Sequence, residues 1–201
     1  MSIVTCLDLE GVLVPEVWIN VAEKTGIEKL RLTTRDISDY DKLMHMRLEI
    51  LAQNNLKLKD IQDVIRTLNP LEGARAFLDE LRRACQVIIL SDTFYEFADP
   101  LMEMLGRPTL FCNKLVVDSQ GRVTDYTLRQ KDGKRKAVQA LHSLQFKVVA
   151  AGDSYNDTSM LAEADAGILF RPPENVIREF PQFPVTRTYG ELRAQIDKCL
   201  C

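Results

Sequence analysis

The chain has 201 residues, of which 26 are basic and 29 acidic, so its net charge is −3. This charge disfavours nucleic acid as a partner, because surfaces that bind nucleic acid are strongly basic. No apolar run approaches the ~18 residues of a membrane span, and residues 1–14 contain no basic residue, which argues against a secretory signal. We therefore expect a cytoplasmic protein with one α/β core and a small insertion.

Cysteine and histidine usage narrows the chemistry further. The five cysteines are an odd number without a C-x-x-C pair, which is typical of reduced thiols rather than of a disulfide frame or a zinc site. With only two histidines, a mechanism that depends on several of them is nearly excluded. Carboxylates, lysine, serine and a hard metal ion are left as the candidate catalytic groups.

Short apolar segments predict the strands of the core. Segments 3–7, 87–90 and 147–151 are apolar almost throughout and then turn abruptly polar, as strands buried on both faces of a parallel sheet do. Segments 166–170 and 183–188 predict further strands, the second at a sheet edge because it contains a proline. Ligands of such sheets bind just beyond the carboxyl ends of the strands.

The long separation of the first two strands predicts an inserted domain. Asp8 and Ser91 are 83 positions apart, whereas a βαβ unit needs only ~30 residues. Apolar stripes at 17–22, 40–51 and 61–68 predict helices in the surplus. The predicted fold is therefore α/β, with a Rossmann-like parallel-sheet catalytic core at residues 1–14 and 70–201 and a small α-helical cap domain at residues 15–69.

Two other helices and a hairpin complete the predicted core. The segment Asn-Pro-Leu-Glu at 69–72 predicts a capped helix start, with apolar residues repeating at helical spacing up to Leu81. Segment 134–144 predicts a helix for which Asp132 is the candidate cap. Alternation on both sides of Asp-Ser-Gln-Gly at 118–121 predicts a β-hairpin.

Polar residues follow each of the three predicted buried strands. The first predicted strand is followed by Asp8 and Glu10, and the second is followed by Ser-Asp-Thr at 91–93. The third is followed by Gly-Asp-Ser-Tyr-Asn-Asp at 152–157. Taken singly, each has a structural explanation, such as a helix cap or a polar strand end. Together with Lys134, they bring carboxylates, hydroxyls and an ammonium to one sheet edge. This combination predicts a Mg²⁺ site beside a phosphate, where a carboxylate can form an aspartyl phosphate.

The order of these motifs resembles that of a known family. It resembles the four-motif signature of haloacid dehalogenase-type phosphohydrolases. The four motifs are Asp-x-(Asp/Glu)-Gly after the first strand, Ser after the second, Lys before a helix, and Gly-Asp-x-x-x-Asp. The small helical cap is similar to that of their phosphoserine phosphatase branch. The segments DLEGVLVPE, SDTFYEF and AAGDSYNDTSML resemble a bacterial subgroup of bifunctional phosphoserine phosphatases and homoserine phosphotransferases.

The resemblance implies the catalytic and metal-binding residues. Asp8 would be the nucleophile and a Mg²⁺ ligand. Glu10 would be the general acid/base, with its backbone carbonyl on the metal. Asp153 would be the third protein ligand of Mg²⁺, and Asp157 would lie just behind these ligands or bind the ion through water. Most family members have Asp where this chain has Glu10, which lengthens the acid/base side chain by one methylene; the resembled subgroup also has Glu.

The resemblance also implies the groups that bind the phosphate. They are Ser91, Lys134 and Asn156, and the adjoining Asp92 is counted among the substrate-binding residues. Lys134 is preferred over Lys131 and Lys136 because it begins a predicted helix, where the macrodipole disfavours a cation unless an anion is close by. The alternative is a solvated lysine in a basic run.

Two residues of the predicted cap would recognise the rest of the substrate. By position, Glu16 would bind the substrate ammonium and Arg47 its carboxylate. Arg47 lies beside the apolar stripe of its helix, and arginine suits bidentate carboxylate binding. The alternative is an arginine whose alkyl chain covers the cap core.

The sequence thus predicts a Mg²⁺-dependent phosphoserine phosphatase that also transfers the phosphoryl group to homoserine. One alternative is a related phosphatase of another small phosphomonoester. The other is a non-catalytic signalling module phosphorylated on aspartate, which the extra length of this chain disfavours. The expected partners are small molecules, with neither nucleic acid nor membrane, and a homodimer is carried as an open alternative to a monomer.

Overall fold

A computed structural model describes residues 2–33, 36–37 and 39–200. These residues form a seven-stranded sheet of order β4-β3-β2-β1-β5-β6-β7, parallel except for β4. The strands are β1 Ile3–Leu7, β2 Gln86–Phe94, β3 Thr109–Val117, β4 Val123–Thr127, β5 Lys147–Gly152, β6 Ala166–Phe170 and β7 Val185–Thr186. The predicted α/β class with a mainly parallel sheet is confirmed. The predicted edge strand at 183–188 is present but has only two residues.

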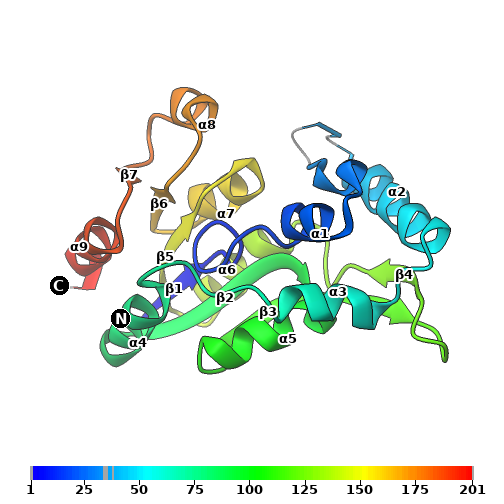
Figure 1. Cartoon of the computed structure of the whole chain (residues 1–201). Helices are drawn as coiled ribbons and strands as arrows, with labels where there is room; N and C mark the ends of the chain where they lie inside the picture. The colour runs from blue at the N-terminus through cyan, green and yellow to red at the C-terminus, as the bar shows by residue number, and fades with distance from the viewer. Residues whose placement is uncertain (1, 34–35, 38, 201) are drawn as a thin grey trace.

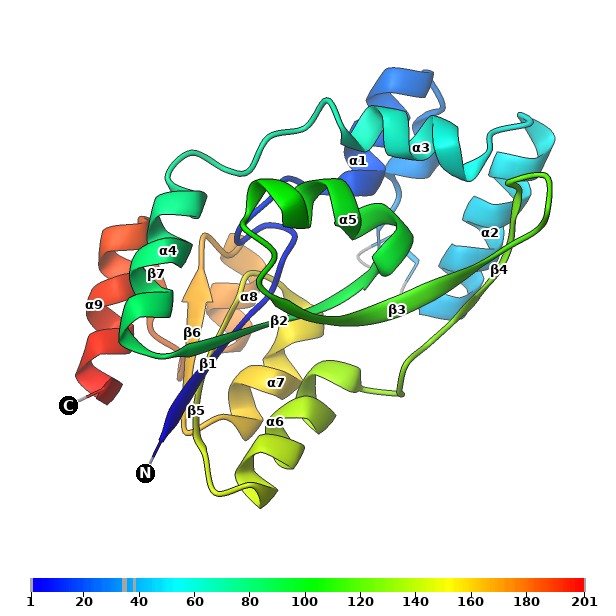
Figure 2. The ribbon, with the colours of Figure 1, turned by 90° about the horizontal axis from the view of Figure 1, so that it is seen from below.

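Helices cover both faces of this sheet (Figure 2). One face carries α4 Ala74–Ala84, α5 Tyr95–Met104 and α9 Tyr189–Leu200, and the other carries α6 Gly133–Ser143 and α7 Thr158–Glu163. A short helix, α8 Glu174–Glu179, precedes β7. Side chains of β1 alternate between the faces: Leu7 packs into the apolar core that includes α4 and α5, whereas Val4 and Cys6 pack into the core that includes α6. The central strands are therefore apolar throughout.

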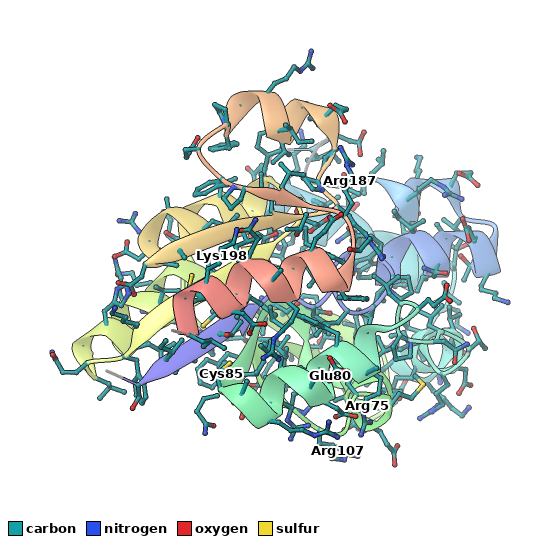
Figure 3. All side chains as sticks on the ribbon, turned by 90° about the vertical axis from the view of Figure 1, so that its left-hand side faces the viewer. Arg75, Glu80, Cys85, Arg107, Arg187 and Lys198 are labelled. Carbon is teal, nitrogen blue, oxygen red and sulfur yellow. The ribbon has the colours of Figure 1, made fainter. Side chains whose placement is uncertain are left out.

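Aromatic side chains pack beneath helices α4 and α9. Figure 3 shows the two helices side by side, with the charged side chains of Arg75, Glu80 and Lys198 at the surface. Beneath them, the ring of Tyr189 stacks on Phe77 with 4.9 Å between centroids. The Tyr189 hydroxyl donates to the Val12 carbonyl at 2.6 Å. This contact fixes the loop that follows β1.

The segment between β1 and α4 is helical, as predicted. Its elements are α1 Val17–Thr25, the 3₁₀ turn η1 Glu28–Arg31, α2 Tyr40–Gln53 and α3 Leu58–Ile65. They stand together beyond the carboxyl ends of the central strands (Figure 1). Gly26 ends α1 with a φ of 71°, the left-handed conformation that favours glycine. Among the helices of the described residues, none has the length and hydropathy needed to cross a membrane.

The antiparallel β3–β4 hairpin confirms the turn predicted at 118–121, and it reaches out to the helical segment (Figure 2). The backbone N–H of Leu58, at the start of α3, donates to the carbonyl of Gly121 in the hairpin turn at 2.9 Å. On β4, the Tyr126 hydroxyl bonds to the carboxylate of Asp41 in α2. The hairpin therefore braces the helical segment against the sheet.

One predicted helix start was wrong, and one predicted cap is confirmed in position only. The helix predicted to begin at Pro70 begins instead at Ala74, after Gly73 with a φ of 82°. The Leu71 N–H donates to Leu13 at 2.9 Å, and this tertiary bond holds the segment in a non-helical path. The helix predicted at 134–144 is α6, and Asp132 occupies its N-cap position as expected, but its side chain makes no capping hydrogen bond. The Asp132 carboxylate accepts instead from the Ser159 hydroxyl at 2.9 Å.

Candidate active site

The loop after β1 places Asp8 in the interior. The Asp8 N–H continues the sheet by donating to the Ala151 carbonyl at 2.9 Å, and the Leu9 N–H donates to the Asp8 carboxylate at 2.7 Å. The chain then turns at Gly11, whose φ is 78°, and a Cβ there would lie 2.5 Å from the Asp153 carboxylate. Only glycine permits both the turn and this close approach. Asp8 is 4% exposed.

The loop after β5 brings two more carboxylates to the same place. Asp157 is fully buried, and its Oδ2 accepts from the N–H groups of Asp153 and Ser154 at 2.9 and 3.1 Å. Asp157 thus stabilises its own loop, and the helix cap that the sequence allowed at this position is absent from α7. One carboxylate oxygen from each of Asp8, Asp153 and Asp157 lies within 4.8 Å of the others. The sequence-predicted metal-binding aspartates are therefore brought together.

Lys134 lies against this cluster of carboxylates. Its Nζ is 2.7 Å from Asp157 Oδ1 and 2.9 Å from Asp8 Oδ1, and its side chain is 4% exposed. The two alternative lysines, Lys131 and Lys136, are exposed at the surface. Lys134 is buried because it lies in the first turn of α6, directly under the ends of β1 and β5.

The buried charges do not balance. Three carboxylates face one ammonium, and burial together with Asp157 and Asp153 raises the pKa of Asp8 well above its usual range, although Lys134 opposes this shift. Burial lowers the pKa of Lys134, but Asp157 and Asp8 outweigh it and hold that pKa well above its ordinary value. The excess of negative charge and the all-oxygen donor set fit a hard divalent cation.

Ser91 and Asp92 lie on the last residues of β2 rather than on a helix cap. The strand continues to Phe94, with its pairing to β3 shifted after Leu90. Ser91 is buried at 7% exposure and accepts a bond from the Thr93 N–H at 3.2 Å. The irregular pairing turns this strand end toward the carboxylate cluster, since Asp92 Oδ2 lies 3.7 Å from Lys134 Nζ.

Asp92 is held by both its backbone and its side chain. Its carbonyl accepts from the Tyr40 hydroxyl at 3.2 Å and from the Asn113 amide at 3.1 Å. Its carboxylate accepts from the Asn156 amide at 2.9 Å. Asp92 thus connects α2, β3 and the loop after β5.

Arg47 is buried in the helical segment with an incomplete set of partners. It is 6% exposed, and its guanidinium lies over the Trp18 ring, 4.5 Å from the centroid. One terminal nitrogen donates to the Leu32 carbonyl at 2.8 Å and the other approaches the Met44 sulfur at 3.7 Å, while Nε has no hydrogen-bond partner among the residues that the structure describes. A buried donor without an acceptor is costly, so the arrangement is suited to an incoming anion.

The acidic residues of the same region keep Arg47 charged. Burial lowers its pKa to about 10, although Tyr40, Glu10 and Glu16 act in the opposite direction. Glu10 also accepts from the Val17 N–H at 2.9 Å, at the start of α1. Glu10, in the loop after β1, is therefore hydrogen-bonded directly to the helical segment.

A single cavity of about 1450 Å³ joins these groups. The sequence-predicted residues that line it are Asp8, Glu10, Glu16, Arg47, Ser91, Asp92, Lys134, Asp153 and Asn156. Asp157 is the one predicted residue outside the lining, because it lies fully buried behind Asp8 and Lys134.

Three lining residues were missed by the sequence analysis. Trp18 supports Arg47, and Tyr40 and Asn113 hold the Asp92 carbonyl. Asn113 had a usable signal, since an asparagine stands within an otherwise mostly apolar strand. Nothing in the local sequence marks the other two.

Comparisons with known proteins identify the family of this chain. A family model described as haloacid dehalogenase-like hydrolase matches residues 6–165. A phosphoserine phosphatase of Pseudomonas syringae pv. tomato and the phosphoserine phosphatase ThrH of Pseudomonas aeruginosa are each 64% identical over 97% of this chain, covering 82% and 95% of their own lengths.

Solved structures show the same fold. A phospho-aspartyl intermediate analogue of phosphoserine phosphatase superposes with a TM-score of 0.77 at 21% identity, over 96% of this chain and 98% of that one. A substrate-bound phosphoserine phosphatase complex gives the same TM-score at 20% identity, covering 97% and 98% of the two chains. The motifs occur in the expected order, and the carboxylates and the lysine gather at one edge of the sheet. Because the family model also matches most of the sequence, the chain belongs to the haloacid dehalogenase-like hydrolases.

Proposed function

We propose that this protein is a Mg²⁺-dependent phosphoserine phosphatase that can also transfer the phosphoryl group from phosphoserine to homoserine. The high identity to two phosphoserine phosphatases, one of them named ThrH, supports the substrate class. The observation that carries the proposal is the buried Arg47, which lines the same cavity as Asp8 and whose Nε lacks a partner within the described part of the chain. Asp8 and Lys134 suit a phosphoryl group, and Arg47 suits the carboxylate of an amino acid.

The first chemical step forms a phosphoenzyme. An Asp8 carboxylate oxygen attacks phosphorus, the bond from phosphorus to the serine oxygen breaks, and Glu10 gives its proton to that oxygen. The donors for the phosphoryl oxygens are Ser91, Lys134 and Asn156. Asp8, Asp153, Asp157 and the Glu10 carbonyl would hold Mg²⁺, which supplies positive charge to the phosphoryl oxygens when bound.

The second step releases Asp8. Glu10, now a carboxylate, takes a proton from the acceptor, whose oxygen attacks phosphorus while the bond to the Asp8 oxygen breaks. Water as acceptor gives inorganic phosphate, and homoserine gives its phosphate ester. Homoserine carries the same ammonium and carboxylate as serine, so Glu16 and Arg47 suit both molecules.

Residues 15–69 would act as a cap over residues 1–14 and 70–201. The helical segment lies against the core, since the Gln62 amide donates to the Glu96 carbonyl at 2.8 Å and Tyr40 donates to the Asp92 carbonyl. A closed cap excludes water from the phosphoenzyme, and the degree of exclusion would set the ratio of hydrolysis to transfer. A cytoplasmic location and a homodimer stay predictions.

Comparing two related substrates tests the proposed function. Phosphate release is measured with O-phospho-L-serine and with phosphoethanolamine, which lacks only the carboxylate, in the presence and absence of Mg²⁺. We expect Mg²⁺-dependent turnover, a strong preference for phosphoserine and an acid-stable phosphoryl adduct on Asp8 by mass spectrometry. The Asp8→Asn variant is the control and should form no adduct. Equal turnover of both substrates would favour a phosphatase of another small phosphomonoester.

A further inference from the structure

Asp92 places a carboxylate where the proposed function requires phosphate donors. Its Oδ2 accepts from the Asn156 amide at 2.9 Å and lies 3.7 Å from Lys134 Nζ. Asn156 and Lys134 are the groups to which the phosphoryl oxygens of the substrate are assigned. A carboxylate and a phosphate both carry negative charge, so a phosphoryl group that binds Asn156 and Lys134 must lie beside a like charge for as long as the Asp92 side chain stays in place.

The way Asp92 is anchored allows its side chain to move while its backbone stays in place. Two hydrogen bonds, from Tyr40 and Asn113, fix the carbonyl. The side chain is 43% exposed, in contrast to Lys134 at 4%. Its carboxylate can therefore turn into the solvent of the cavity without any change in β2.

We propose that Asp92 is an internal anion that occupies the phosphate donors in the ligand-free protein, and that its return to them helps to expel inorganic phosphate. The inference rests on the proposed function, since it takes Asn156 and Lys134 as phosphate donors. Asp92 thereby acts as a positioning residue: it keeps the Asn156 amide oriented between turnovers, and its charge beside Lys134 weakens the binding of the product.

The first variant, Asp92→Asn, removes the negative charge of the side chain and keeps its size. In Asp92→Asn, the side-chain carbonyl can still accept from Asn156, but the negative charge beside the bound phosphate is gone. We expect inorganic phosphate to bind about tenfold more tightly, because removing a unit charge within a few ångströms of an anion changes its affinity strongly even in a water-like medium. The inhibition constant of phosphate as a product should fall by the same factor. A purely structural role for Asp92 would weaken phosphate binding in this variant.

Calorimetric titration with inorganic phosphate, at fixed Mg²⁺, tests the proposal. Asp92→Asn and the smaller Asp92→Ser are both measured, so that a folding defect in one leaves the other informative. The matched control is Asp132→Asn, an exposed acid that lines the same cavity and bonds to Ser159. Its phosphate affinity should change by less than about twofold, since a more distant exposed charge is screened.

Unchanged or weaker phosphate binding by both Asp92 variants would overturn the inference, as would an equal gain in the control. The titration requires no turnover. If the unmodified protein failed to hydrolyse phosphoserine, the proposed function would be wrong, yet tighter phosphate binding by the Asp92 variants would still support the internal anion.

Discussion

Replacing Arg47 by methionine should weaken catalysis and stabilise the fold at once. Methionine has a similar volume to the arginine stem and suits the contacts with Trp18 and Met44. The substitution removes a buried guanidinium whose Nε has no partner in residues 2–33, 36–37 and 39–200. If the guanidinium serves the substrate carboxylate, the protein carries this cost for the sake of binding.

The structure gives the size of the stability change. Burial lowers the pKa of Arg47 from 12.5 to about 10, which corresponds to about 3 kcal/mol. The folded protein binds this proton less tightly than the unfolded chain, so the cost is present at every pH below about 10. The lost bond to Leu32 and the lost contact with Trp18 offset it by about 1 kcal/mol each. We expect Arg47→Met to raise the free energy of unfolding by about 1 kcal/mol.

The catalytic loss should depend on the carboxylate of the substrate. A charge-assisted, two-point contact of about 3 kcal/mol corresponds to a roughly 100-fold fall in kcat/KM for phosphoserine. For phosphoethanolamine, which has no carboxylate, we expect little change. The control is Arg31→Met in the same helical segment, because Arg31 is exposed and its ion pairs with described residues are to the exposed Glu23 and Glu28.

Steady-state kinetics with both substrates and denaturant unfolding of each variant are the measurements. An equal loss of kcat/KM on both substrates would refute the carboxylate role of Arg47. A marked loss of stability would refute the reasoning from burial, and would indicate that the arginine stabilises the helical segment.

Three other predictions concern the carboxylate cluster. Gly11→Ala should abolish activity, because the added Cβ would lie 2.5 Å from the Asp153 carboxylate. The control is Gly26→Ala, which has a similar φ but open space around it; this variant should keep its activity, and its free energy of unfolding should fall by only about 1 kcal/mol. Chelation should stop turnover, and added Mg²⁺ should restore it and raise the melting temperature measured by calorimetry, since the ion binds the folded state. The raised pKa of Asp8 contributes stability that is fully present below pH 3.8 and is lost as the pH rises through the pKa of the folded protein. In the presence of a chelator, Asp8→Asn should therefore melt at a higher temperature than the unmodified protein at neutral pH, and the two melting temperatures should converge in acid. A difference in melting temperature that stays constant with pH would contradict this.

The sequence was most informative where the chemistry lies at strand ends. Asp8, Ser91 and Asp153 each follow a buried apolar run, and parallel strands end at one edge of the sheet, so their convergence follows from topology alone. The helical segment was predictable for a similar reason, because the spacing of Asp8 and Ser91 exceeds what one βαβ unit needs.

Features that depend on distant partners were not predictable. Pro70 carries a strong local signal for a helix start, but the bond from Leu71 to Leu13 overrides it. Asp92 looked like part of a helix cap, whereas β2 continues past it with shifted pairing. Trp18 supports Arg47 across 29 positions of sequence. In each case a tertiary contact outweighs a local preference of about 1 kcal/mol.

The phosphotransfer activity can be observed directly by ³¹P NMR of the protein with O-phospho-L-serine and Mg²⁺, with and without L-homoserine. We predict that inorganic phosphate alone grows without homoserine, and that a phosphohomoserine signal grows at the expense of phosphate when homoserine is present. Asp8→Asn should produce neither signal. Unchanged phosphoserine in both samples, or turnover retained by Asp8→Asn, would contradict the proposed function.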